Sequence, residues 1–163
     1  LTEDRKRHGL VLEETIAKNM SLASLHKLSR LGLVGSTQEI LKSEEYRKRL
    51  RVKTDSLFKW VKHLSGGNQQ KVVFAKCLMT EPKVLFLDEP TRGVDVGAKA
   101  EIYGIIDQLA KNGMAIVLVS SELPEVLGVS DRILVMCDGQ LKSELSAVEA
   151  DQEKLMAAAT SFH

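Results

Sequence analysis

The chain has 163 residues, of which 44% are hydrophobic, and its formal net charge at pH 7 is +1. Such a chain can bury one good core, so one domain is expected, and the balanced charge excludes a basic face for nucleic acid or an acidic tail. The longest apolar run, residues 115–119, is far short of the roughly 20 residues that a helix needs to cross a bilayer.

From about residue 13 to residue 80 the chain carries helical periodicity and no convincing strand. Apolar residues such as Ile40 and Leu41 stand among dense lysine, arginine and glutamate, which is typical of helices with one buried stripe. Gly32 and Gly35 predict a loop between helical segments.

After Thr80 the pattern changes to alternating strands and helices. Residues 84–88 are apolar up to a final aspartate, and this run predicts a strand that is buried on both faces. A helix is expected from about residue 97 to residue 111, where Asn112-Gly113 supplies the signal for its C-terminal cap.

The remaining residues continue the alternation. Residues 115–120 predict a second buried strand, and a short helix with Pro124 in its first turn follows. Asp138-Gly139 predicts a tight hairpin between strands 132–137 and 140–145, and a closing helix is expected over residues 151–159. Strand, helix, strand, helix indicates a parallel sheet with a hairpin at one end.

Two carboxylates follow the first predicted strand. Ligands of open parallel sheets bind outside the carboxyl ends of the strands, where Asp88 and Glu89 would stand. Asp88 is suited to hold Mg²⁺, and Glu89 is placed to polarise a water for attack on a terminal phosphate. The alternative is that both residues merely cap a loop.

A second candidate site is the start of a helix within the string His63-Leu-Ser-Gly-Gly-Asn-Gln-Gln-Lys71. Ser65, Gly66 and Gly67 precede an amphipathic helix, and unpaired N–H groups at a helix N-terminus suit a phosphate. The alternative is an ordinary serine cap with a glycine-rich turn. Trp60, just upstream, is predicted to anchor the core.

The familiar phosphate cradle is missing from the sequence. No G-x-x-x-x-G-K-[ST] string occurs anywhere in it. The chain begins with Leu1 and not with Met, and we therefore expect it to be a segment of a longer protein that is inactive by itself.

In this order and spacing the two strings resemble the signature motif and the Walker B strand of an ATP-binding-cassette (ABC) ATPase. Nearly the whole chain is similar to the second ATPase half of the duplicated ATP-binding subunit of bacterial monosaccharide importers (ribose, galactose, arabinose and xylose class). The supporting strings span residues 2–10, 64–71, 88–97, 119–126 and 131–136.

The resemblance implies a fold and a domain organisation. The fold would be α/β, a partial RecA-like P-loop NTPase core (a parallel sheet with a C-terminal hairpin) plus the helical subdomain of the ABC family. The whole chain, residues 1–163, would be a partial ABC ATPase domain. Its helical subdomain with the signature would span about residues 10–71, and the C-terminal part of the core about residues 72–163.

The resemblance also assigns further site residues. Glu3 lies where most ABC ATPases have the Q-loop glutamine, and Asn68 replaces the usual first signature glutamine. Asp95 falls in the D-loop, which touches the opposite ATPase half, although it can equally cap the following helix. Ser121 occupies the position of the switch histidine, and a serine can neither carry a positive charge nor shuttle a proton near pH 7. Helix capping by Ser120 and Ser121 is the alternative.

By the same resemblance the parent protein would use ATP and Mg²⁺ to power sugar import. Its partners would be another ATPase half of the same or a second subunit, membrane permease subunits and, indirectly, a periplasmic sugar-binding protein. It would be cytoplasmic, peripheral on the inner membrane, and the segment by itself is expected to self-associate. Two alternatives stay open, a non-hydrolysing regulatory half of the same subunit and a soluble ABC-type ATPase of translation or DNA repair.

Overall fold

A computed structural model describes residues 1–2, 4–30 and 33–160 of the chain. The chain forms two compact units, Leu1–Val117 and Leu118–His163. None of the helices in these described ranges is long and apolar enough to cross a membrane.

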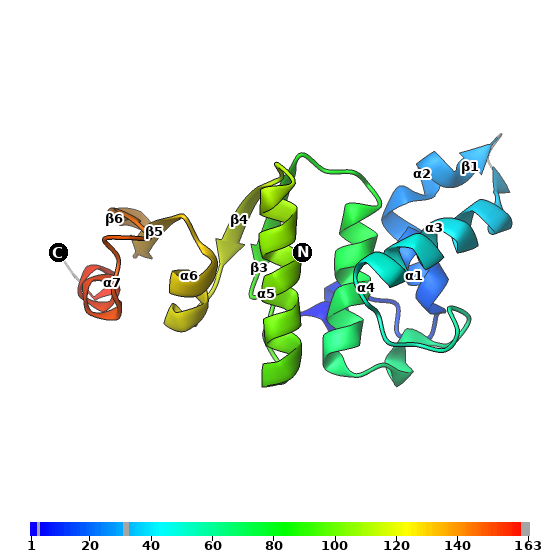
Figure 1. Ribbon diagram of the computed structural model, residues 1–163, viewed down its shortest axis with the longest axis horizontal. Helices are drawn as coiled ribbons and strands as arrows, with labels where there is room; N and C mark the ends of the chain where they lie inside the picture. The colour runs from blue at the N-terminus through cyan, green and yellow to red at the C-terminus, as the bar shows by residue number, and fades with distance from the viewer. Residues whose placement is uncertain (3, 31–32, 161–163) are drawn as a thin grey trace. The chain divides into compact units, whose positions relative to one another are not determined.

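The first unit begins with short helical elements (Figure 1). They are the π-helical turn η1 (Arg5–Gly9), α1 (Ile16–Ser21), the 3₁₀ turn η2 (Leu22–Ser24) and α2 (Leu25–Leu28). A two-residue antiparallel pair, β1 (Ser29–Arg30) with β2 (Leu33–Val34), stands where the sequence predicted only a loop. Gly32 lies outside the described residues, and Gly35 takes the N-cap position of α3 (Ser36–Arg49).

The helix that follows the candidate signature is the centre of this unit. The 3₁₀ turn η3 (Val61–His63) precedes α4 (Gly66–Leu78), which contacts α1, α3 and α5 (Figure 1). Val72, Val73 and Phe74 of α4 are at most 1% exposed. Trp60 is 45% exposed beneath the Lys62 ammonium, so the prediction that it anchors the core is wrong.

The strands of the core follow α4. β3 (Val84–Asp88) pairs with β4 (Ala115–Val119) in a parallel sheet, and α5 (Val96–Lys111) connects the two. Asn112 caps α5 and Gly113 has a φ of +86°, as the Asn-Gly signal predicted.

The prediction that both strands are buried on two faces is wrong. Leu85 and Leu87 of β3 are buried, whereas Val84 and Phe86 between them are 46% and 64% exposed. Val117 of β4 is 44% exposed. A continuous apolar run favours two covered faces, but only one face of β3 is covered by the described residues.

The second unit contains the hairpin and the last helices. α6 (Leu123–Val129) carries Pro124 in its first turn, and β5 (Arg132–Cys137) pairs antiparallel with β6 (Gln140–Ser146). Asp138 and Gly139 have φ values of +49° and +72°, as the predicted tight turn requires. α7 (Gln152–Ala159) packs against β5, and the cluster around Ile133, Val135 and Leu155 forms the core of this unit.

Candidate functional site

Ser65 stands at the N-cap position of α4, but its side chain does not cap the helix. Among the described residues, no backbone N–H in the first turn of α4 donates a hydrogen bond to the Ser65 side chain. Ser65 Oγ instead accepts a hydrogen bond of 2.9 Å from Asn68 Nδ2. The alternative of an ordinary serine cap is therefore wrong, and the first turn of α4 presents its N–H groups without a side-chain acceptor.

The Asn68 side chain joins the start of α4 to the segment that follows α3. Its Oδ1 accepts a hydrogen bond of 2.8 Å from the backbone N–H of Lys53. Because a backbone N–H can only donate, this contact fixes which end of the amide faces Lys53 and which end faces Ser65.

The two glycines of the signature allow close approach between protein segments. A Cβ atom built on Gly67 would lie 2.4 Å from the Ala98 Cβ on α5, and one built on Gly66 would lie 2.8 Å from Arg5 Nη2. The sequence predicted glycine for contact between backbone and phosphate. The structure adds a packing reason for it, since α4 and α5 meet at Gly67.

Asp95 begins α5 and does act as a cap. Its side chain accepts a hydrogen bond of 2.9 Å from the Ala98 N–H, and its backbone carbonyl accepts from Lys99. The capping role is thus observed, and the proposed D-loop role is not exclusive of it.

A pocket of about 260 Å³ lies between the starts of α4 and α5. It is lined by predicted site residues together with neighbours of opposite charge: Lys53, Ser65, Gly67, Asn68, Lys71, Asp95, Gly97, Ala98 and Glu101. The structure therefore brings most of the candidate signature residues together with Asp95. The start of α4, for which the described part of the chain supplies no side-chain cap, favours an anionic ligand there, whereas Asp95 already caps the start of α5.

The sequence analysis did not identify the charged residues Lys53, Lys71 and Glu101 that line this pocket. The Lys71 side chain is only 2% exposed, and its Nζ donates to a Glu101 carboxylate oxygen and, at 3.0 Å, to the Arg51 carbonyl. Lys53 Nζ reaches the other Glu101 oxygen at 3.3 Å. Hydrogen bonds from Lys71 and then Lys53 hold the pKa of Glu101 below its usual value. A lysine four residues after Gly67 lies on the same helix face, which is the signal that could have indicated it.

Arg5 is a second residue that the sequence analysis missed. Its Nη1 and Nη2 donate to the carbonyls of Arg92 and Gly93 at 2.7 and 3.0 Å, in the segment between Glu89 and Asp95. Burial lowers the pKa of Arg5, and its Nε has no hydrogen-bond partner among the described residues. No local pattern marks this contact, because the partners lie more than 80 residues away along the chain.

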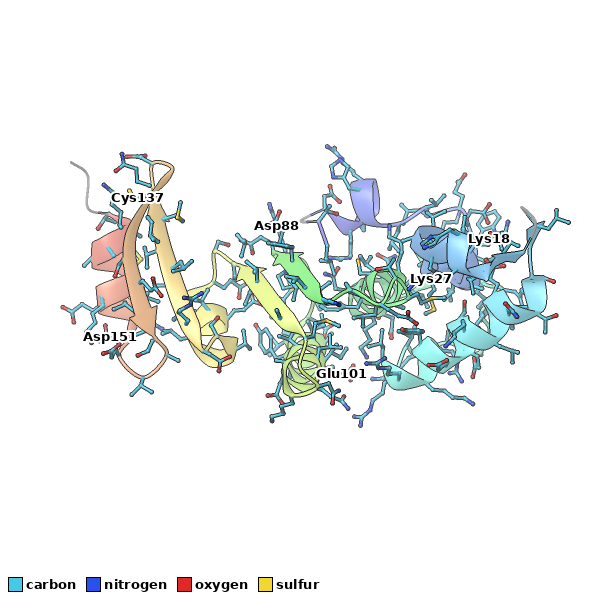
Figure 2. All side chains as sticks on the ribbon, turned by 90° about the horizontal axis from the view of Figure 1, so that it is seen from above. Lys18, Lys27, Asp88, Glu101, Cys137 and Asp151 are labelled. Carbon is cyan, nitrogen blue, oxygen red and sulfur yellow. The ribbon has the colours of Figure 1, made fainter. Side chains whose placement is uncertain are left out.

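Asp88 is the last residue of β3 and is exposed at the tip of the strand (Figure 2). Its N–H donates to the Leu1 carbonyl at 3.1 Å, while the Leu1 amino group donates to the Phe86 carbonyl at 2.8 Å. The residues with described placement contain no group of three or more His, Cys, Asp or Glu that could hold a metal. One carboxylate still fits Mg²⁺, which keeps several waters and binds substrate phosphates.

Glu89 follows with a φ of +46°, in the left-handed region that non-glycine residues rarely adopt. Its carbonyl accepts a hydrogen bond of 3.1 Å from the Arg92 N–H. Strained backbone of this kind clusters at functional sites, and that favours the catalytic hypothesis for Glu89.

Ser121 belongs to the second unit, where it is exposed after β4. The local turn is made by its neighbour, because Ser120 Oγ accepts from the Glu122 N–H and donates to the buried Glu125 carboxylate. The switch role of Ser121 stays a prediction. Glu3 lies outside the described residues, and its Q-loop role stays a prediction too.

The chain is similar to sugar-import proteins of several bacteria. The L-arabinose transport ATP-binding protein AraG of Geobacillus stearothermophilus is 56% identical over 156 residues, 96% of this chain and 30% of that protein. The xylose import ATP-binding protein XylG of Geobacillus kaustophilus is 54% identical over 98% of this chain and 32% of its own length. The ribose import ATP-binding protein RbsA of Clostridium tetani is 48% identical over 99% and 32%. The chain thus spans about a third of the length of these relatives.

Solved structures support the fold. The ATP-binding cassette MJ1267 of an ABC transporter superposes with a TM-score of 0.75 at 22% identity, over 91% of this chain and 63% of that one. The dimeric cassette MJ0796 bound to ADP and Pi gives a TM-score of 0.72 at 23% identity, over 85% and 59%. The sequence pattern that defines the ABC transporter family matches residues 2–92. With that match and the cassette fold, the chain belongs to the ABC transporter family.

Proposed function

We propose that this chain is part of the ATP-hydrolysing subunit that powers sugar import through an ABC transporter. The observation that carries the proposal is the uncapped start of α4, which faces a pocket shared with the start of α5. The printed functions of AraG, XylG and RbsA support it. In this proposal the chain caps the phosphates of one ATP with its signature and supplies Asp88 and Glu89 for hydrolysis of another.

The roles of the signature residues follow from their chemistry. Ser65, with the N–H groups of Gly66, Gly67 and Asn68, would donate hydrogen bonds to phosphate oxygens. These donors are held in place before any charge develops on the phosphate, and such preorganised donors stabilise a transition state strongly. Asp95 would contact the opposite ATPase half.

The hydrolytic roles fall on the end of β3 and the residues near it. Glu89 would accept a proton from the attacking water and Ser121 would donate a hydrogen bond to the terminal phosphate, while Glu3 would lie at the Q-loop position. Asp88 would hold Mg²⁺, and that ion would neutralise charge on the phosphate oxygens when bound.

The partners proposed are a second ATPase half and the membrane permease subunits, with a periplasmic sugar-binding protein acting indirectly. In this proposal the permease would dock on a pocket of about 310 Å³ in the helical part. Val11, Leu22, Leu25 and Val34 line it with Glu14 and Lys18. The subunit would lie on the cytoplasmic face of the inner membrane.

A regulatory, non-hydrolysing half is the second candidate function, and Ser121 is the observation that favours it. A serine offers one neutral hydrogen bond where a histidine can approach as a cation, and charge-assisted hydrogen bonds are about twice as strong. This half would then bind nucleotide without turning it over.

The two candidates differ in how ATP turnover responds to substitutions at Ser121. We expect Ser121→His to raise steady-state ATPase activity of the complete subunit with its permease, and Ser121→Ala to lower it. Both effects should vanish when Glu89→Gln is added, because that change removes the base. If substitutions at Ser121 and at Glu89 both leave the ATPase activity unchanged, hydrolysis at this site is rejected and the regulatory half is favoured.

A further inference from the structure

The hydrogen-bond arrangement of Ser65 is unusual for a serine at the start of a helix. The side chain of an N-cap serine normally accepts a hydrogen bond from the backbone N–H two or three residues on. For Ser65 that partner would be the N–H of Gly67 or Asn68. Its Oγ is taken instead by the Asn68 side chain, with Nδ2 at 2.9 Å.

The orientation of the Asn68 amide is fixed by its other end. Oδ1 accepts the Lys53 N–H at 2.8 Å, so Nδ2 must face Ser65. The segment around Lys53 is itself held, since Lys71 Nζ donates to the Arg51 carbonyl and Lys53 Nζ pairs with Glu101. The Lys53 N–H that orients Asn68 therefore belongs to a segment that is itself held by hydrogen bonds and an ion pair.

A count of donors and acceptors shows the consequence for the hydroxyl. A serine hydroxyl has one proton and two acceptor sites. An amide NH₂ can only donate, so Asn68 occupies an acceptor site of Ser65 Oγ and leaves its proton available. Ser65 is exposed and lines the pocket between α4 and α5. Its proton and the first-turn N–H groups of α4 are then all available to one anion.

We infer that Asn68 is a positioning residue that prevents Ser65 from capping α4, and so keeps the first-turn N–H groups available to an anion together with the Ser65 hydroxyl proton. The inference rests on the proposed function, in which Ser65 contacts phosphate, and adds a residue that acts through Ser65.

The choice of side chain at this position follows from the two contacts. Aspartate would still accept a hydrogen bond from the Lys53 N–H. Its second oxygen would also accept one from the Ser65 hydroxyl, which could then no longer donate to phosphate. Leucine has a similar volume and makes neither contact, so Ser65 would be released to cap α4. Glutamine is one methylene longer and cannot keep both distances without a shift of α4 or of Lys53.

A double-mutant cycle in the complete subunit with its permease tests the inference. We expect Ser65→Ala to lower kcat roughly 10²- to 10³-fold, the range for loss of one preorganised donor. Asn68→Leu should lower kcat by a similar factor, while the double variant should be no slower than either single variant. An Asn112→Leu variant, at the far end of α5, is the matched control and should keep the original kcat.

Amide hydrogen exchange of this chain supplies a readout that does not depend on turnover. In Asn68→Leu, Ser65 should cap α4, so the backbone N–H at position 68 should exchange more slowly than in the original chain. The slowing should disappear when Ser65→Ala is added.

The outcomes separate the two proposals. If Ser65→Ala leaves kcat unchanged, the phosphate contact of the proposed function is wrong, and exchange at position 68 still decides the orientation of Asn68. If Ser65→Ala lowers kcat but Asn68→Leu lowers it equally in both backgrounds, Asn68 acts independently of Ser65 and the inference is overturned. Unchanged exchange at position 68 in Asn68→Leu would also overturn it.

Discussion

A buried lysine in the signature helix is tolerated because its charge is matched. Removal of a charged group from water is costly unless it is paired and hydrogen-bonded, and Lys71 meets both conditions through Glu101 and the Arg51 carbonyl. Arg51 itself has a φ of +51°, just beyond the end of α3. Lys71 thus stabilises an unfavourable backbone conformation and joins α4 to α5 at the same time.

Removal of the Glu101 charge should destabilise the chain in a pH-dependent way. The pKa of Glu101 is lower in the folded chain, so the carboxylate stabilises the fold above its unfolded pKa, and this contribution is lost as pH falls through the folded pKa. Because Glu101 is 42% exposed, we expect Glu101→Gln to lower the free energy of unfolding by only about 1–2 kcal/mol at pH 7. Urea unfolding at pH 7 and at pH 3 measures the difference, which should shrink at the lower pH.

Glu144→Gln is the matched control for this prediction. Glu144 pairs with Arg132 at 3.0 Å, but both side chains are more than half exposed. Such surface pairs contribute roughly 0–1 kcal/mol. An effect of Glu101→Gln no larger than that of Glu144→Gln would show that Lys71 does not depend on its partner.

Glu89 should be a position where stability and activity conflict. Its φ of +46° is strained for any residue with a Cβ, and glycine removes the strain. We expect Glu89→Gly to be more stable than Glu89→Ala by about 1 kcal/mol, since both variants lose the same carboxylate but only alanine keeps the Cβ. Urea unfolding of the two variants tests this, and equal stabilities would mean that the backbone at Glu89 is unstrained.

At the scale of elements, the sequence predicted correctly those features that depend on interactions between residues close together in the chain. The bounds of α5, the hairpin at Asp138-Gly139 and the helix after Asp151 all follow from caps and left-handed turns that lie within a few residues of each other. Burial of β3 was predicted wrongly because the number of covered faces depends on other segments. The missed contact of Arg5 joins residues 87 positions apart, and sequence spacing carries no signal for it. The place of Lys71 on the helix face of Gly67 was a usable signal, but nothing local indicated its partner Glu101, 30 positions away.

The contact between α4 and α5 should have room for only one Cβ atom between Gly67 and Ala98. Gly67→Ala would place two Cβ atoms about 2.4 Å apart, so the helices must separate, and overpacking of this kind costs roughly 1–3 kcal/mol. Adding Ala98→Gly should restore part of the lost stability by removing the opposing Cβ.

Thermal unfolding of both single variants and the double variant gives the coupling between the two positions. We expect the double variant to be more stable than Gly67→Ala alone, even though Ala98→Gly alone weakens α5 through the poor helix propensity of glycine. Strict additivity of the two changes would contradict a direct steric contact.

At the scale of the whole molecule, the unusual feature is that one side of the sheet formed by β3 and β4 exposes apolar side chains. Val84, Phe86 and Val117 expose apolar surface on neighbouring strands, whereas scattered apolar residues on a surface are ordinary. The relatives are about three times as long as this chain, and their further residues could cover the corresponding strands in those proteins.

This chain by itself should therefore self-associate through β3, and Phe86→Glu should weaken the association. A charge at the centre of an apolar face must be desolvated when two copies pack together, which disfavours the contact. Light scattering across a concentration series should show dimers or larger species for the original chain and a shift toward monomers for Phe86→Glu. Val148→Glu makes the same kind of change at an isolated side chain that is 97% exposed, and it should leave association unchanged. A monomeric original chain at high concentration, or equal effects of the two substitutions, would show that β3 is not the contact surface.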